Sequence, residues 1–303
     1  MAGDGVRGVF ALGAVLVVAA GLAVARAVPD SGEHASGGYD GRGTVTLGLS
    51  SITMLAGLTL AVSLGWTSPV TIALLVVSAV SLGLWVRHER RADDPLIDVH
   101  VLTIRPVALA NVATVGLGWA LFGSYLLIPE FARTDPGAGY GLGADSLEVG
   151  LLLLPLALAQ TVCSTTAGFA SRIPARVVFA TGLALVAGGS GLLSVVHHST
   201  AGVAAGALLL GMGAGFALEA GSATVTEAVE GDVAAVSAAV NSTVRRLAGG
   251  VGGQTSTLLL ASVVVAGHPR FAAFRTAYLV AAGLSLLGGL LVLRAREDGQ
   301  GLS

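Results

Sequence analysis

The sequence predicts an all-α integral membrane protein with about nine transmembrane helices, because it is poor in charge and contains long uncharged segments. Of the 303 residues, 54% are hydrophobic and only 11% are charged, whereas a soluble domain carries about 25% charged residues. This composition excludes an ordinary water-soluble enzyme, and it makes the lipid bilayer the expected partner. The formal net charge of −2 gives no field that would attract nucleic acid, so we expect no nucleic-acid partner.

Nine segments of at least 17 residues contain no Asp, Glu, Lys or Arg. A helix needs about 20 apolar residues to cross the hydrocarbon core, because each residue rises about 1.5 Å. The segments are continuous, whereas transmembrane β-strands alternate in polarity over about ten residues, so helices are expected. The expected spans are residues 9–25, 44–64, 70–86, 107–129, 149–171, 177–196, 200–218, 247–267 and 276–293.

The placement of arginine predicts the orientation, since cytoplasmic loops collect basic residues. All 16 basic residues are arginine. Nine antiparallel spans put the termini on opposite sides, with ten arginines in the loops of one side and four in those of the other. We therefore expect a multi-pass protein of the cell membrane whose C-terminus is cytoplasmic. Its longest external loop is expected at residues 130–148.

The first span has a second interpretation, as a signal peptide. Arg7 precedes an apolar run, and residues 25–27 resemble a small-x-small cleavage site. Asp4 weakens the positive N-terminal region and the run is long for a signal peptide, which favours a retained helix. Cleavage would leave eight spans in the same orientation.

The most charged segment, residues 87–105 (RHERRADDPLIDVHVLTIR), separates three spans from the six that follow. We place a domain boundary within it. Residues 1–104 then hold the three N-terminal spans and the charged cytoplasmic linker, and residues 105–303 hold a bundle of six helices.

Several motifs, in chain order, resemble those of one family. Residues 90–99 (RRADDPLIDV), followed by a helix that begins near Arg105, resemble the linker before the ninth helix of fourteen-helix drug:proton antiporters of the major facilitator superfamily. Further similar segments are 121–129 (LFGSYLLIP), 148–157 (EVGLLLLPLA), 168–172 (GFASR), 211–216 (GMGAGF) and 241–250 (NSTVRRLAGG).

The resemblance covers essentially the whole chain but only the C-terminal two-thirds of the family's fold. It implies that residues 9–26 correspond to the sixth helix, residues 44–86 to two linker helices, and residues 105–303 to a six-helix bundle of the major facilitator type. The family's first five helices, which carry the proton-coupling acid and the antiporter motif, have no counterpart. The family implies a membrane transporter that exports hydrophobic or cationic small molecules by proton antiport. The alternative is a truncated, non-transporting or partner-dependent remnant.

Glu219 is the first candidate for binding a proton or a substrate. It stands where the family usually has an apolar residue or proline, and an ionisable residue inside a span is by default a functional hypothesis. Moving the seventh span to residues 203–225 would bury Glu219, which could then hold a proton or meet a cationic substrate. The alternative is an interfacial residue at a helix end.

Arg245 is the second candidate. Residues 233–267 would form about 50 Å of helix, whereas the hydrocarbon core is about 30 Å thick. The helix therefore overhangs the membrane, and Arg245 and Arg246 can snorkel to the inner interface. The other interpretation pairs one arginine with an acid as a gate. The available acids are Glu219, Glu227 and Glu230.

Polar and aromatic residues lie on one face of the fourth span, at spacings of three and four residues. They are Asn111, Thr114, Gly118, Phe122 and Tyr125. The fifth span carries Gln160, four residues before Ser164. Facing stripes could line a substrate cavity, with Asn111, Tyr125 and Gln160 as candidates. The alternative is hydrogen bonding that only holds the bundle together.

Three absences and one glycine pattern complete the expectations. The sequence contains no paired carboxylates, no metal-ligand spacing and no nucleophile elbow, so we expect neither an enzyme nor a cofactor or metal. Gly211, Gly213 and Gly215 follow no strand, and they are expected to allow close helix packing rather than nucleotide binding.

Overall fold

The computed structural model describes residues 2–27, 40–91, 103–167, 173–196, 198–229, 233–262, 264–265 and 268–294. The chain divides into two compact units, Met1–Tyr39 and Asp40–Ser303, and each is described here by itself. Residues 28–39, residues 92–102 of the charged segment 87–105, and residues 168–172 lie outside the described residues. The domain boundary at 104/105 therefore stays a prediction. The sequence predicts a cytoplasmic loop at residues 28–43, but α2 already begins at Gly41.

The first unit contains α1 (Ala2–Ala27), which covers the first expected span. Arg26 lies in its last turn, where a cation interacts favourably with the carbonyl end of the helix dipole. The choice between a retained helix and a cleaved signal peptide stays open.

A hairpin of two helices, α2 (Gly41–Leu64) and α3 (Pro69–Glu89), begins the second unit. Gly65, which follows α2, has a φ of +86°, and glycine adopts positive φ without the steric cost that a Cβ imposes. Pro69 is the first residue of α3, a position where the missing N–H has no intrahelical partner to lose. The short turn therefore stops one helix and starts the next antiparallel to it.

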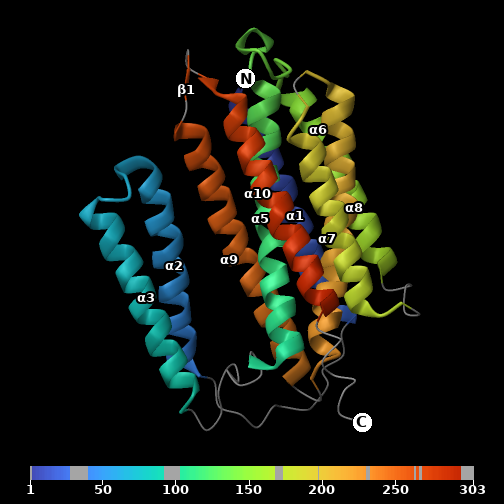
Figure 1. Ribbon diagram of the computed structural model, residues 1–303. Coiled ribbons are helices and arrows are strands. Elements are labelled where there is room, and N and C mark those ends of the chain that lie inside the picture. Colours follow the sequence, from blue (N-terminus) through green and yellow to red (C-terminus); the bar gives the residue numbers. More distant parts are fainter. Residues whose placement is uncertain are drawn as a thin grey trace. The chain divides into compact units, whose positions relative to one another are not determined.

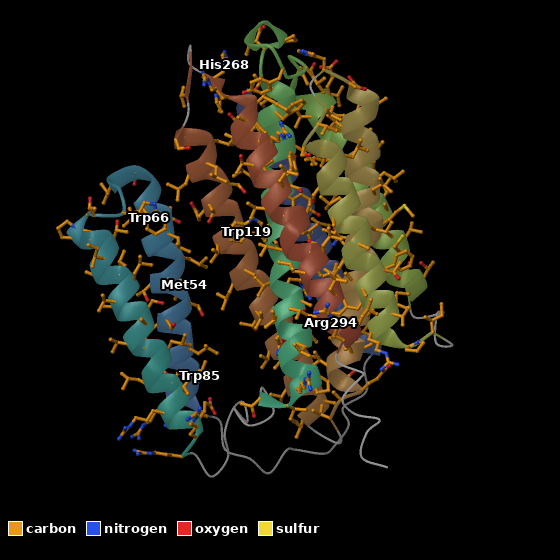
Figure 2. All side chains as sticks on the ribbon, in the orientation of Figure 1. Met54, Trp66, Trp85, Trp119, His268 and Arg294 are labelled. Atoms are coloured by element: carbon orange, nitrogen blue, oxygen red, sulfur yellow. The ribbon has the colours of Figure 1, made fainter. Side chains whose placement is uncertain are left out.

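Two serines hold the hairpin helices together at mid-length. Ser50 Oγ donates to the Ser78 carbonyl oxygen at 3.1 Å, and Ser78 Oγ donates to the Ser50 carbonyl oxygen at 2.9 Å. Small residues let the backbones approach, and their hydroxyls satisfy one another where lipid offers no partner. Trp66 and Trp85 mark the two ends of the hairpin (Figure 2).

Six further helices form a bundle (Figure 1). They are α5 (Arg105–Arg133), α6 (Ser146–Ala167), α7 (Ala175–Leu193), α8 (Thr200–Thr226), α9 (Val233–Ser262) and α10 (Phe271–Arg294). The main contacts join α7 to α8, α6 to α8, α5 to α9, and α10 to both α5 and α7. The order around the bundle is thus α9, α5, α10, α7, α8, α6. Leu117, Phe179, Leu210 and Phe274 belong to its buried core.

The glycine pattern of α8 lies in close helix contacts, as predicted. A Cβ at Gly211 would overlap the backbone of α6 at Leu156, and one at Gly215 would overlap it at Gln160. A Cβ at Gly213 would overlap the backbone of α7 at Gly182. The three glycines therefore let α8 touch α6 on one side and α7 on the other.

Short irregular elements cover the end of the bundle where α5 meets α6. They are η1 (Pro136–Ala138) and the paired strands β1 (Val264–Val265) and β2 (His268–Pro269). The Tyr140 hydroxyl donates to the Pro269 carbonyl, and the Tyr140 ring packs against Phe131, Phe271 and Phe274. This aromatic cluster ties the loop after α5 to the start of α10.

The hairpin contacts the bundle through α9. The Leu55 side chain of α2 fills the space that a Cβ at Gly250 would need, and Gln254 Nε2 donates to Thr59 Oγ1 at 3.1 Å. Gly250 and Gln254 lie on the side of α9 away from α5. α2 thus covers part of the polar, small-residue side of α9.

The predicted all-helical membrane fold is confirmed. The described residues contain nine α-helices that correspond to the nine expected spans, and seven of them are long and apolar enough to cross a membrane. α9 is not among the seven, since it is rich in Gly, Ser and Thr and carries two arginines. It also begins earlier than the expected span at 247–267 and ends at Ser262, because the segment after it forms the two short strands.

The contact between α5 and α9 can be tested at Gly118. Gly118→Ala would place a Cβ on the carbonyl oxygen of Arg245, and backbone cannot move aside as a side chain can. We expect a loss of about 1–3 kcal/mol, measured as a lower Tm of the purified protein. Gly253→Ala is the matched control, because a Cβ there meets nothing within 4 Å. Equal Tm losses in both variants would contradict this contact.

Candidate substrate-binding face

Four helices carry the residues that the sequence singled out. Asn111 and Tyr125 lie on α5, Gln160 on α6, Glu219 on α8 and Arg245 on α9. α5 contacts α9, and α6 contacts α8, while α5 and α8 contact each other in the middle of the bundle. The five residues therefore lie on neighbouring helices of one bundle, although their side chains do not form one connected cluster.

The first half of the α5 stripe is bound to α9. Asn241 Nδ2 donates to Asn111 Oδ1 and to Thr114 Oγ1, each at 2.9 Å. Thr114 and Asn241 are 1% and 0% exposed. Hydrogen bonds that a buried amide donates to a neighbouring helix stabilise helix association, although Asn241 Oδ1 has no hydrogen-bond partner among the described residues. The geometry at Asn111 thus fits the bundle-holding interpretation, and a substrate role for Asn111 stays a prediction.

The second half of the stripe is open. Phe122 and Tyr125 are each 41% exposed, and the Tyr125 hydroxyl donates to Gln160 Oε1 at 3.1 Å. The stripes of α5 and α6 therefore meet through one hydrogen bond. Both interpretations of the stripes allow this contact, and a substrate role for Tyr125 and Gln160 stays a prediction. Phe122 and Tyr125 offer an aromatic surface, and the Tyr125 hydroxyl and the Gln160 amide form its polar edge.

Glu219 lies within α8, which continues to Thr226 rather than ending at Leu218. Its side chain is exposed in the described structure, and its charge attracts the half-buried Arg245 of α9. No salt bridge joins the two among the described residues. Arg245 Nη2 also reaches Ser242 Oγ at 3.5 Å, and the exposed Arg246 repels it. The interpretation that pairs Arg245 with Glu219 is thus favoured electrostatically over pairing with Glu227, while Glu230 lies outside the described residues.

Asn241 is the residue whose importance the sequence did not reveal. It stands in the motif at residues 241–250, but nothing in its spacing indicates that it binds two side chains of α5. The signal that could have found it is the rule that a polar amide within a span needs a partner on another helix.

No family model matches the chain. Among curated proteins, it is 30% identical over 193 residues to the multidrug resistance protein Stp of Mycobacterium tuberculosis, covering 62% of this chain and 34% of Stp. It is 29% identical over 189 residues to the methyl viologen resistance protein SmvA of Salmonella typhimurium, covering 61% of this chain and 37% of SmvA. The uncharacterised MFS-type transporter YhcA of Bacillus subtilis matches at 29% identity over 38% of this chain and 20% of YhcA.

A solved structure shares the fold. The nucleoside transporter NupG superposes with a TM-score of 0.53 at 16% identity, covering 82% of this chain and 66% of that one. The protein thus has the fold of a membrane protein of the major facilitator type. Its relatives are named as multidrug or methyl viologen resistance proteins and as an MFS-type transporter, as the sequence motifs indicated. The chain spans about a third of the length of Stp and SmvA.

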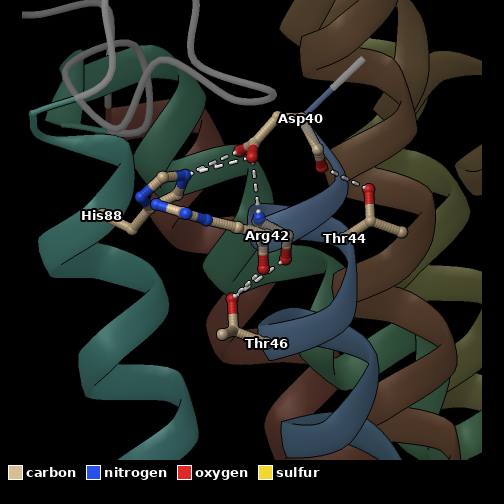
Figure 3. Close-up of polar contacts among 6 residues, drawn as sticks. Asp40, Arg42, Thr44, Thr46 and His88 are labelled. Carbon is tan, nitrogen blue, oxygen red and sulfur yellow. Dashed lines mark hydrogen bonds and ion pairs between the residues drawn. The ribbon is translucent and has the colours of Figure 1, made fainter.

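A further polar cluster lies where α2 begins and α3 ends (Figure 3). His88 Nε2 contacts Asp40 Oδ1 at 3.0 Å, and Asp40 also caps α2 by accepting a hydrogen bond from the Gly43 N–H at 2.9 Å. The Gly43 hydrogen bond, aided by His88, holds the pKa of Asp40 below its usual 3.8 despite some desolvation. An aspartate before an apolar run is a cap signal, but a partner 48 residues away is not visible in the sequence.

We expect Asp40 to stabilise the hairpin through its charge. Because its pKa is lowered by folding, the stabilisation is complete above the unfolded value and is lost as the pH falls through the folded value. Asp40→Asn keeps an N-cap acceptor but removes the charge, so the Tm should fall at neutral pH. The difference from the parent protein should shrink as the pH drops below 3.8.

Asp135→Asn is the matched control for Asp40→Asn, since Asp135 caps η1 by accepting from Gly137. The control should change the neutral-pH Tm less than Asp40→Asn does. A Tm difference between Asp40→Asn and the parent protein that is the same at neutral and acidic pH would argue against stabilisation by the Asp40 charge.

Proposed function

We propose that the chain is part of a major-facilitator transporter that exports hydrophobic or cationic small molecules by proton antiport. The observation that carries this proposal is the combination of an open aromatic pair, Phe122 and Tyr125, with a carboxylate, Glu219, on neighbouring helices of the bundle. The names of its relatives support it, since they refer to multidrug and methyl viologen resistance. Methyl viologen is a flat dication.

The chemistry of this face suits such cargo. An aromatic face attracts a cation through its ring quadrupole, and the attraction grows when water is excluded. A carboxylate inside a span pairs with a cation or takes up a proton, because an unpaired charge is costly at that depth. We infer that Glu219 alternates between a protonated state and a state paired with substrate. When Glu219 is ionised and no substrate is bound, its carboxylate is stabilised by the charge of Arg245.

We propose that the protein lies in the plasma membrane and that its C-terminus is on the cytoplasmic side. Ala138 of η1 would then be external and Ile173, before α7, cytoplasmic; both are exposed. Single cysteines at these positions in a Cys163→Ala background are to be labelled with a membrane-impermeant thiol reagent. We expect intact cells to label position 138 and not position 173, and both to label after lysis. Labelling of position 173 alone in intact cells would reverse the orientation.

Glu219→Gln tests the coupling proposal. The substitution keeps the shape and removes the titration, so efflux of a fluorescent cation should fall by at least about tenfold and lose its dependence on external pH. Efflux of a neutral substrate should fall less. Glu148→Gln, an exposed glutamate at the start of α6, is the control and should leave efflux unchanged.

Two results would count against the proposal. Unchanged cation efflux and pH dependence in Glu219→Gln would make Glu219 an interfacial residue. The absence of efflux from cells expressing the 303-residue chain, with or without the substitution, would favour a non-transporting or partner-dependent role.

A further inference from the structure

A cavity of about 340 Å³ lies at one end of the bundle, and neither Glu219 nor Tyr125 lines it. It is an open cavity lined by α5, α7, α8 and α10, at the end where α5 and α7 begin and α8 and α10 finish. Its volume falls within the range of small-molecule sites, which starts at about 300 Å³. Leu109, Ala110 and Val292 give it an apolar lining.

Two opposite charges line this cavity without binding each other. Arg176 lies in the first turn of α7 and Glu227 is the C-cap of α8. No salt bridge joins Arg176 to Glu227 in the described part of the chain. Arg176 is half-buried and Glu227 is exposed at the cavity, so a ligand that reaches from one to the other contacts both charges.

The helix ends reinforce this separation of charge. The N-terminus of α7 carries partial positive charge and the C-terminus of α8 partial negative charge. Pro174 is the N-cap of α7 and makes no side-chain cap hydrogen bond. The Val177 N–H donates to the Pro174 carbonyl, so in the first turn the N–H groups of Ala175 and Arg176 are left to other acceptors. One side of the cavity therefore favours an anionic group and the other a cationic group.

We propose that this cavity binds a small zwitterion, with its phosphate or carboxylate on Arg176 and its ammonium group on Glu227. The proposal is independent of the transport function, because no residue of the candidate substrate-binding face lines the cavity. An isolated anion would satisfy Arg176 alone, and an isolated cation would satisfy Glu227 alone. The zwitterion can be a free compound or the headgroup of phosphatidylethanolamine, since both carry the same charges.

The test measures the Tm of the purified full chain in detergent against increasing phosphoethanolamine. We expect a saturable rise in Tm, with inorganic phosphate and ethanolamine each giving a smaller rise. Arg176→Gln and Glu227→Gln should each weaken the apparent affinity about tenfold or more, since each removes a charge-assisted hydrogen bond. The matched controls are Arg275→Gln and Glu130→Gln, which neutralise exposed charges at the other end of the bundle and should leave the affinity unchanged.

The source of the zwitterion is distinguished in nanodiscs. If the rise in Tm with phosphoethanolamine is lost in phosphatidylethanolamine discs but kept in phosphatidylglycerol discs, the lipid headgroup already occupies the site and is its ligand. If the rise in Tm is equal in both kinds of disc, the ligand is a free compound. Either result supports the site. The proposal is overturned if phosphoethanolamine does not shift the Tm, if phosphate alone acts equally well, or if Arg176→Gln and Glu227→Gln leave the affinity unchanged while both variants stay folded by size exclusion.

Discussion

Close contact between helix backbones is the constraint on which this structure depends. Lipid tails are as apolar as leucine, so helices in a bilayer gain little from burying aliphatic side chains against one another. They associate instead where small residues let whole backbones touch. Gly213 against α7, Gly211 against α6 and Gly118 against α9 are such points. The order of helices around the bundle follows from which glycines face which neighbour.

The same constraint explains the position of α9. This helix is too polar to count among the seven apolar spans, so its polar groups need protein partners. α5 supplies hydrogen-bond acceptors to Asn241 on one side, and α2 supplies Leu55 and Thr59 on another. The hairpin of α2 and α3 therefore shields part of α9 from lipid, which would solvate the polar groups of α9 poorly.

The polar residues of the bundle divide into two kinds. The Asn241 amide nitrogen donates to the buried Thr114 and to the half-buried Asn111, and these hydrogen bonds contribute to packing. Glu219, Tyr125 and Phe122 are exposed on neighbouring helices, and Arg176 and Glu227 line a cavity without pairing. The Asn241 amide nitrogen uses its hydrogen bonds within the chain, whereas the open side chains retain the capacity to bind something else. This difference, rather than residue type, separates the structural residues from the candidate binding residues.

The sequence by itself determined the membrane class, the nine helices and the relation to drug transporters, because run length and motif order are local properties. It also placed Tyr125 and Gln160 on polar stripes of their own helices, since the helical period is known in advance. That the two residues face each other is shown by the structure. Only the tertiary structure decided that Asn111 is engaged by Asn241, that α2 rests on α9, and that Arg176 and Glu227 share a cavity. These pairings join residues between about 50 and 200 positions apart along the chain, and helix propensity and periodicity carry no information on which helix lies beside which. Glycine-mediated backbone contact chooses the neighbours, and that choice exists only once the helices have packed.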